Sequence, residues 1–316
     1  MASQAAFADG TDGFRTSDGV WLAVTDSGAR DAAVTVLFAH GWTLDSRSWD
    51  DLTALLVAGA GVPVRAIAVD CRGHGRSGPA GKGGATLARY ADDLAELIDR
   101  RIPTGRVVLV GHSMGGMAMM ALAERHEDLV RRRVAGAAFL ATAAGRLDKA
   151  VAKVPGLLSV LLPLVGLGFR VYRVLPAALR RRAIAWLLFG REPRALDVAR
   201  TVDEMQRADP RSMHRFGRDI MAHDRAHHLS RYESAATLVA AGSQDKLCPP
   251  THARKIASRL PSSTLLVYPG AGHQLPYECA VDLAPHLIDL AERAASFDVD
   301  SARGTGAAAP IADESA

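Results

Sequence analysis

A serine flanked by glycines follows a short apolar run in the first half of the chain. Residues 111–116 read Gly-His-Ser-Met-Gly-Gly and directly follow the apolar run VVLV. Their last three residues begin the helix-forming segment MGGMAMMALAER. An abrupt turn from strand to helix strains the backbone at the serine, and only residues without a Cβ fit two positions to either side, here Gly111 and Gly115. The turn exposes the hydroxyl of Ser113 beside the N–H groups and positive dipole end of a helix. The pattern therefore predicts a nucleophilic serine next to a site for an oxyanion.

Buried strands are predicted on both sides of this serine. Six apolar runs are nearly continuous rather than alternating, as in strands covered on both faces. They occupy residues 33–39, 64–70, 106–111, 133–142, 236–242 and 264–270. Residues 86–101, TLARYADDLAELIDRR, have apolar side chains at helical spacing, with an opposite, polar face that we expect to contain Asp92, Asp93, Glu96 and Asp99. Strands that alternate with helices predict a mostly parallel sheet with right-handed connections.

The start of this alternation and an interruption within it define the expected domains. Residues 13–28 predict a hairpin with its turn at residues 17–19, which adds an antiparallel edge to the sheet. The alternation stops after Thr142 and resumes near Ala235, and the interval is helical in composition. We therefore expect a core domain in two parts, residues 1–142 and 235–297. Residues 143–234 are expected to form an inserted helical cap, and residues 298–316 a disordered tail.

Composition and charge exclude one class of partner. The 316 residues are 48% hydrophobic and 23% charged, which is typical of one large globular unit. The net charge of +4 is spread along the chain. The arginine clusters at 131–133 and 180–182 lack interleaved aromatic residues and any zinc-finger or helix-turn-helix spacing. We expect these clusters to lie on solvated helix faces, and we predict no nucleic-acid partner.

Cysteine usage and hydropathy predict a cytoplasmic protein. Cys71, Cys248 and Cys279 are an odd number of cysteines at unrelated spacings, which disfavours a disulfide framework. The N-terminus has neither the basic region nor the apolar region of a secretory signal. The most apolar stretch, residues 154–169, is too short to span a bilayer comfortably and is broken by prolines. No transmembrane segment is expected.

Several motifs, in a fixed order along the chain, resemble those of the α/β-hydrolase fold, and more narrowly of its esterase, lipase and haloperoxidase-like branch. They are HGWTLDSRSW from His40, DCRGHGRS from Asp70, GHSMGG from Gly111, GSQDKLCPP from Gly242 and GAGHQLPYE from Gly270. The resemblance spans residues 33 to 295, with most of the cap excluded. It implies a mostly parallel eight-stranded sheet flanked by helices, an inserted helical cap, and an activity that needs no cofactor and no metal.

The resemblance assigns three side chains to a catalytic triad. Ser113 matches the nucleophile, Asp245 the acid and His273 the base, in the chain order that this fold uses. A serine hydroxyl is a poor nucleophile until a base takes its proton, and histidine is the side chain that titrates close enough to neutrality to accept and return it. The aspartate would hold the imidazole in the required tautomer and offset its positive charge.

The same resemblance implies an oxyanion hole beside the nucleophile. Gly41 and Trp42, which follow His40, match the oxyanion loop, and the backbone N–H of Trp42 would act together with that of Met114. His40, His74 and His112 are expected to shape their loops through hydrogen bonds rather than to take part in the chemistry. Asp70 and Arg72 are expected to stabilise the loop after their strand.

These assignments predict a serine hydrolase that cleaves a small-molecule carboxylic ester through an acyl-enzyme. The apolar cap favours an apolar acyl group, and a fatty acyl group is one candidate. Perhydrolysis of the haloperoxidase-like kind and hydrolysis of thioesters, amides or carbon-carbon bonds use the same triad and stay open, as does a hydrolase-like ligand-binding receptor. Epoxide hydrolases and haloalkane dehalogenases use an aspartate where Ser113 stands, so they are disfavoured.

Two further features of the predicted cap have alternative interpretations. His223, His227 and His228 are spaced like metal ligands on a helix, but a solvated helix face is favoured because no further ligand accompanies them. The apolar stretch 151–189, with its arginines, could contact a lipid surface peripherally. We favour packing of its leucines over the core, and either interpretation gives an apolar acyl site. Cys248 is expected to be a small packing residue.

Overall fold

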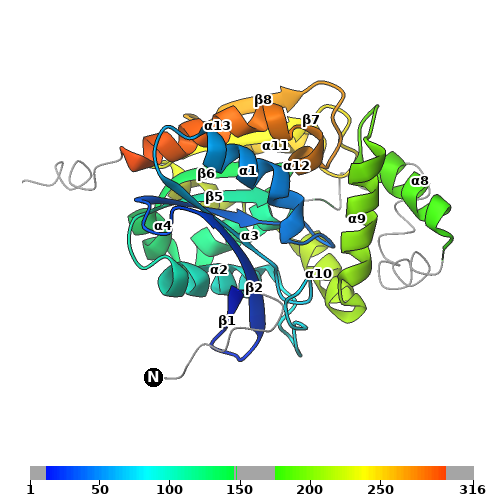
Figure 1. Ribbon diagram of the computed structural model, residues 1–316, viewed down its shortest axis with the longest axis horizontal. Coiled ribbons are helices and arrows are strands. Elements are labelled where there is room, and N and C mark those ends of the chain that lie inside the picture. Colours follow the sequence, from blue (N-terminus) through cyan, green and yellow to red (C-terminus); the bar gives the residue numbers. More distant parts are fainter. Residues whose placement is uncertain (1–11, 146, 148–174, 297–316) are drawn as a thin grey trace, which may run out of the picture.

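The computed structural model describes residues 12–145, 147 and 175–296 (Figure 1). Eight strands form one open sheet in the order β1-β2-β4-β3-β5-β6-β7-β8. Their bounds are β1 (Asp12–Arg15), β2 (Trp21–Gly28), β3 (Val34–Ala39), β4 (Val64–Val69), β5 (Arg106–His112), β6 (Val134–Leu140), β7 (Ala236–Gly242) and β8 (Thr264–Tyr268). Each predicted apolar run coincides with one strand of this sheet, and β5 extends one residue beyond its run. The predicted fold class is confirmed.

The first two strands form the antiparallel edge that the sequence predicts. Strand β1 pairs antiparallel with β2, and β2 pairs antiparallel with β4, whereas the remaining pairs are parallel. The hairpin turn closes where the N–H of Gly19 donates to the carbonyl of Thr16 at 2.9 Å. Gly19 has a φ of 85°, a conformation that glycine adopts without strain.

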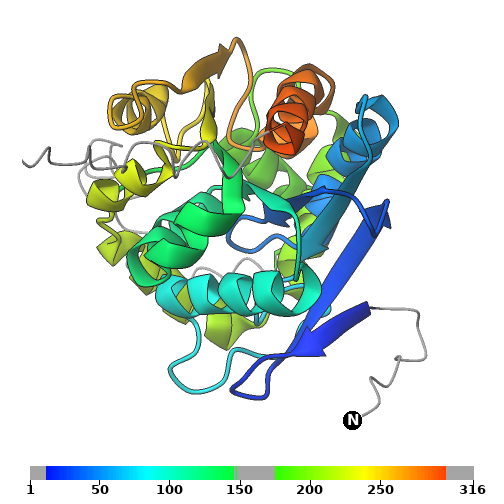
Figure 2. The same cartoon turned by 90° about the vertical axis from the view of Figure 1, so that its left-hand side faces the viewer.

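Helices cover both faces of the sheet (Figure 2). They comprise η1 (Ser46–Trp49), α1 (Asp50–Gly59), α2 (Leu87–Arg101), α3 (Met114–Arg125), α4 (Glu127–Arg133), α8 (Ala177–Leu188), α9 (Ala195–Arg207), α10 (Pro210–Ala222), η2 (Ala226–Tyr232), α11 (Pro250–Ala257), α12 (Leu275–Glu278) and α13 (Ala280–Ala295). Alternate residues of β3 face opposite sides: Val36 and Phe38 pack in the cluster with α1 and α13, and Leu37 packs in the cluster with α2 and α3. Because both faces of β3 are buried, its sequence is apolar except for Thr35.

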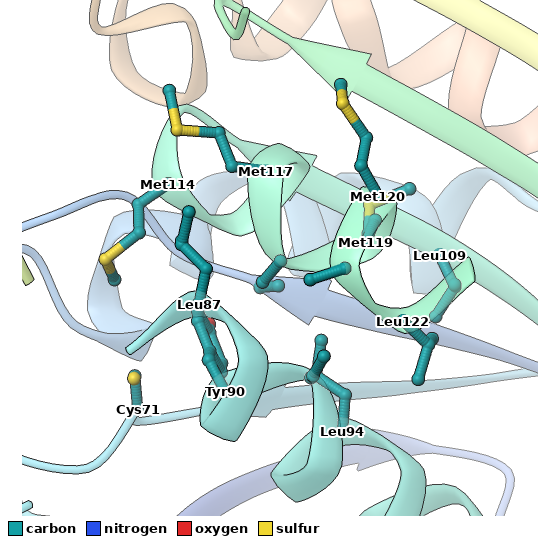
Figure 3. Close-up of a cluster of buried hydrophobic side chains, with 14 of the residues drawn as sticks. Cys71, Leu87, Tyr90, Leu94, Leu109, Met114, Met117, Met119, Met120 and Leu122 are labelled. Atoms are coloured by element: carbon teal, nitrogen blue, oxygen red, sulfur yellow. The ribbon is translucent and has the colours of Figure 1, made fainter. Parts of the chain in front are cut away.

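The packing of α2 against α3 forms the base on which the serine turn rests. Figure 3 shows Leu87, Tyr90 and Leu94 of α2 directed towards α3, which contributes methionines and Leu122. Met114 and Met120 are fully buried in this layer. Unbranched methionine side chains fill irregular gaps, and here they pack around α3, with Met117 and Met120 directed away from α2 in Figure 3.

The helices between β6 and β7 belong to two packing groups. Helices α8 and α9 share a small apolar cluster with Tyr277, and they lie beyond the end of the sheet in Figure 1. Helix α10 and η2 instead insert Phe216 and Tyr232 into the large cluster on the α2–α3 face. In the described part of this interval the only extended pairing is a single bridge between Gly145 and Asp224. The apolar stretch 154–169 and the predicted tail lie outside the described residues, and the domain boundaries stay predictions.

No helix within the described ranges has the length and apolar character needed to cross a membrane.

The prediction that Asp93 lies on a polar helix face is wrong. Its side chain is only 3% exposed and forms two hydrogen bonds with Arg72, from Nε at 2.7 Å and from Nη2 at 2.6 Å. Burial raises the pKa of Asp93 to about 6, even though Arg72 opposes this shift. Arg72 follows β4 and is itself fully buried. The carboxylate therefore faces inward because a buried arginine from another element needs a counter-charge.

This pair predicts an unequal response to two arginine substitutions. Arg72→Ala leaves Asp93 buried without its main partner and should lower the free energy of unfolding by about 3–5 kcal/mol. Arg125 also bonds an aspartate twice, Asp92 at 2.8 and 2.9 Å, but its side chain is 43% exposed. Arg125→Ala should therefore cost only about 0–1 kcal/mol. Urea unfolding of both variants measures the difference, and equal losses would contradict the role given to burial.

Candidate active site

Ser113 occupies the strained turn between β5 and α3. Its φ of 51° and ψ of −114° lie in a backbone region that residues other than glycine rarely adopt. The turn is held from the neighbouring strand: the N–H of Ser113 donates to the carbonyl of Leu140 at 2.9 Å, and the hydroxyl of Thr142 donates to the carbonyl of Ser113 at 2.7 Å. Leu140 is the last residue of β6 and Thr142 lies two residues beyond it, so the end of this strand and the loop after it stabilise the strained conformation.

The glycines of the motif are required by close backbone contacts. A Cβ on Gly115 would lie 2.0 Å from the carbonyl oxygen of Ala39, at the end of β3. A Cβ on Gly111 would lie 2.5 Å from the sulfur of Met119 and 2.6 Å from the backbone nitrogen of Gly116. All three distances are too short for a side chain at either position. The spacing of glycines around Ser113 therefore reflects helix α3 packing directly on the strands.

A chain of hydrogen bonds joins the three predicted triad residues. The Nε2 atom of His273 lies 3.0 Å from Oγ of Ser113, and its Nδ1 atom lies 2.8 Å from Oδ2 of Asp245. The side chains of His273 and Asp245 are 5% and 0% exposed. In the chain, His273 is 28 residues from Asp245 and 160 residues from Ser113, and the fold brings the three side chains together. A hydroxyl, an imidazole and a carboxylate in this order can transfer a proton from the serine.

Asp245 is oriented by the backbone that follows it. Its Oδ1 atom accepts the N–H groups of Leu247 and Cys248, both at 2.8 Å, which leaves Oδ2 for His273. Asp245 does not cap the helix that follows it, because Pro249 occupies the N-cap of α11. Cys248 is buried, and burial raises the pKa of its thiol, so it is not an activated nucleophile.

Hydrogen bonds to its main chain hold His273 in place. They come from residues to which the sequence alone assigns no role at the site. The N–H of His273 donates to the carbonyl of Leu188 at 2.8 Å, and the carbonyl of His273 accepts Nε2–H of His112 at 2.8 Å. The rings of His112 and His273 are 5.0 Å apart. Glu278 accepts hydrogen bonds from the backbone on both sides of His273. The motif GAGHQLPYE contains Glu278, but nothing in its spacing indicates which groups the carboxylate contacts.

The predicted oxyanion loop lies close to the serine turn. A Cβ on Gly41 would lie 2.8 Å from Nδ1 of His112, the residue before Ser113. The indole Nε1–H of Trp42 donates to the carbonyl of Met213 at 3.2 Å, which ties the loop to α10. Met114 begins α3. Across the described ranges, the backbone N–H groups of Trp42 and Met114 have no protein acceptor.

The other motif histidines have the structural roles that the sequence predicts. Nδ1–H of His40 donates to the carbonyl of Gly41 at 2.8 Å, and its Nε2 accepts the N–H of Cys71 at 2.9 Å. Nδ1–H of His74 donates to the carbonyl of Arg72 at 3.2 Å. Burial lowers the pKa of His40 and His74, so both rings are neutral. His40 connects its own loop to the loop after β4, whereas the hydrogen bond of His74 stays within the latter loop.

The expectation that the histidines from His223 lie on a solvated helix face is wrong for His223 itself. It is buried at the C-cap of α10, and its Nε2–H donates to the carbonyl of Ala143 at 3.1 Å. Burial lowers its pKa to about 4. His227 and His228 lie on η2. Within the described residues no three histidine, cysteine, aspartate or glutamate side chains are grouped so that they could hold a metal ion.

The family model described as "Alpha/beta hydrolase family" matches residues 36–286. The chain belongs to this family. Solved alpha/beta hydrolases with the same fold include a thermophilic esterase from Thermogutta terrifontis, with a TM-score of 0.72, 26% identity, and coverage of 90% of this chain and 98% of that one. An esterase from Exiguobacterium antarcticum has a TM-score of 0.75 and 19% identity over 89% and 99% of the two chains.

Two curated relatives of higher identity match over shorter stretches. A bifunctional esterase/perhydrolase from Acinetobacter calcoaceticus is 42% identical over 102 residues, which are 32% of this chain and 34% of that protein. A non-heme chloroperoxidase from Kitasatospora aureofaciens is 39% identical over 112 residues, or 35% and 38%. The matched region therefore spans little more than a third of either relative. These similarities support a hydrolase of the α/β-hydrolase fold.

His112 makes acid stability a test of the site's packing. Burial lowers its pKa from 6.5 to about 3, so below pH 6.5 the unfolded chain binds a proton that the folded protein excludes. Stability is lost as the pH falls from about 6.5 towards about 3. Between pH 7 and pH 5, this histidine should lower the unfolding free energy of the wild-type protein by about 2 kcal/mol, and His112→Gln should not show that part of the decrease. Denaturant unfolding at both pH values measures this effect, with the exposed His214→Gln as control. An unchanged pH dependence in His112→Gln would contradict a buried, neutral His112.

Proposed function

We propose that the protein is a serine hydrolase that cleaves carboxylic esters with an apolar acyl group through an acyl-enzyme on Ser113. One observation carries this proposal: the hydrogen bonds from Ser113 to His273 and from His273 to Asp245, at 3.0 and 2.8 Å. In this proposal the three residues form a catalytic triad, and no cofactor or metal takes part.

In the proposed acylation, His273 Nε2 takes the proton of Ser113 as Oγ bonds to the ester carbonyl carbon. The carbonyl oxygen becomes an oxyanion, and the imidazolium is stabilised by Asp245. When the tetrahedral intermediate collapses, the bond to the alcohol oxygen breaks and the alcohol leaves with the proton from His273. Water then repeats the sequence at the acyl carbon, which releases the carboxylic acid and restores Ser113.

The backbone N–H groups of Trp42 and Met114 would form the oxyanion hole. Both are without a protein acceptor in the described part of the chain, and Met114 lies at the positive end of the α3 dipole. Removing one such donor in other enzymes costs about 3 to 4 kcal/mol of transition-state stabilisation. Gly41 would allow the loop to approach, since its Cα already lies against His112.

The surroundings of this proposed hole support an apolar acyl group. The partly buried ring of Trp42 packs against the large core cluster, and Met114 and Met213 belong to the same cluster. Helices α8, α9 and α10 would belong to a cap that covers this side of the core. A cytoplasmic location is part of the proposal and is supported by the three buried, free cysteines. Peripheral lipid contact through the cap stays the less favoured alternative to packing over the core.

Perhydrolysis is a second candidate because two relatives carry names of that kind, the esterase/perhydrolase and the non-heme chloroperoxidase. The acyl-enzyme would be the same. Hydrogen peroxide would replace water in the second step, so that a peracid leaves instead of a carboxylic acid. The two activities differ only in what attacks the acyl carbon, and both need Ser113.

The proposal predicts Ser113-dependent turnover of p-nitrophenyl esters, measured from acetate to palmitate. Ser113→Ala should abolish turnover above background, and Asp245→Asn should lower kcat by about 10⁴-fold because it favours the wrong imidazole tautomer. The chain length with the highest kcat/KM reports the depth of the acyl site. Addition of hydrogen peroxide, with a halide oxidation assay, separates perhydrolase from esterase.

The control for these variants is the melting temperature, which should stay close to that of the wild-type protein in Asp245→Asn. Equal turnover by wild type and Ser113→Ala would contradict the proposed mechanism. Binding of esters by a folded protein that releases no product from any of them would favour the ligand-binding receptor.

A further inference from the structure

Glu278 gathers three backbone N–H groups around His273. Its Oε2 atom accepts from Gly190 at 2.7 Å and from Gly272 at 2.9 Å. Its Oε1 atom accepts from Gly272 at 3.1 Å and from Gln274 at 3.0 Å. Two of these amides flank His273 in the sequence, and the third comes from the loop after α8. One carboxylate therefore connects both sides of the histidine to a distant segment.

The segment at the end of α8 contacts the same loop through its own backbone. The carbonyl of Leu188 accepts the N–H of His273 at 2.8 Å, and the N–H of Arg191 donates to the carbonyl of Gly270 at 3.0 Å. A Cβ on Gly190 would lie 1.8 Å from that carbonyl oxygen, and a Cβ on Gly272 would lie 2.4 Å from the carbonyl carbon of Phe189. The two backbones therefore meet without room for a side chain on either glycine.

We propose that Glu278 is a positioning residue for the base, and that it acts with residues 188–191 to hold the imidazole of His273 within reach of Ser113. This inference rests on the proposed function. The loop before His273 contains Gly270, with a φ of 79°, and Gly272, so the backbone there has wide conformational freedom. Hydrogen bonds from amides to a carboxylate are stronger than those between neutral groups, which suits them to restrict this freedom.

The contacts of Glu278 separate its role from that of Asp245. In the described structure its two oxygens accept only backbone N–H groups, whereas Asp245 bonds the imidazole itself. Glu278 thus acts on His273 through the main chain. Because one of its partners is Gly190, the same carboxylate makes the placement of His273 depend on the segment between β6 and β7.

The test compares Glu278→Ala and the isosteric Glu278→Gln with a matched control. Glu292→Ala is suitable because Glu292 also accepts a glycine N–H, that of Gly61 at 2.8 Å, and this bond involves neither His273 nor its sequence neighbours. The measurements are kcat and KM on the best p-nitrophenyl ester, the rate of Ser113 modification by a fluorophosphonate, and the melting temperature. Modification of Ser113 needs the base but no ester substrate.

Glu278→Ala should lower both kcat and the modification rate by about 10- to 100-fold, because small displacements of a reacting group are that costly. KM should change by less than about threefold, since substrate contacts are retained. Glu278→Gln keeps one acceptor oxygen, so its kcat and its rate of Ser113 modification should lie between those of Glu278→Ala and wild type. Glu292→Ala should keep wild-type rates.

Wild-type kcat and modification rates in both Glu278 variants, with or without a lower melting temperature, would overturn the inference. So would rates in Glu278→Gln that equal those of Glu278→Ala while the melting temperature is unchanged. Failure of the proposed function gives a different result: the wild-type protein hydrolyses no ester. The fluorophosphonate rates then still test whether Glu278 positions His273.

Discussion

The contact between Gly115 and the carbonyl of Ala39 is the constraint on which the rest of the site depends. Because α3 begins directly against the end of β3, the chain must turn within one residue, and Ser113 has the strained φ that results. Hydrogen bonds from the end of β6 hold that turn, and the apolar layer between α2 and α3 supports the helix behind it. The energy for the strain comes from sheet pairing and core packing rather than from the site itself.

Parallel strands explain how residues far apart in the chain meet at this turn. Strands β5, β7 and β8 run in the same direction, so their carboxyl ends present Ser113, Asp245 and His273 at one edge of the sheet. Each side chain is then oriented locally: Ser113 by its turn, Asp245 by two amides, and His273 by its main-chain partners. The sheet brings the three groups near each other, and the loops set the distances between their atoms.

Features that leave a mark within a short stretch of sequence could be predicted. The glycines around Ser113 and the nearly continuous apolar runs are such marks, even though the contact behind Gly115 comes from Ala39 on another strand. Asp93 and His223 could not be placed correctly, because their burial depends on Arg72 and on Ala143, which come from other elements. Glu278 was missed for the same reason: its partner Gly190 is 88 residues away.

The proposed mechanism requires that Oγ of Ser113 bonds to the acyl group, and trapping that bond tests the mechanism most directly. The protein is mixed with p-nitrophenyl butyrate, quenched in acid during turnover and analysed by mass spectrometry of its peptides. The proposed mechanism predicts one butyryl group on the peptide that contains Ser113, and no butyryl group on that peptide in Ser113→Ala. Hydrolysis that continues without this adduct, or an adduct on another residue, would contradict it.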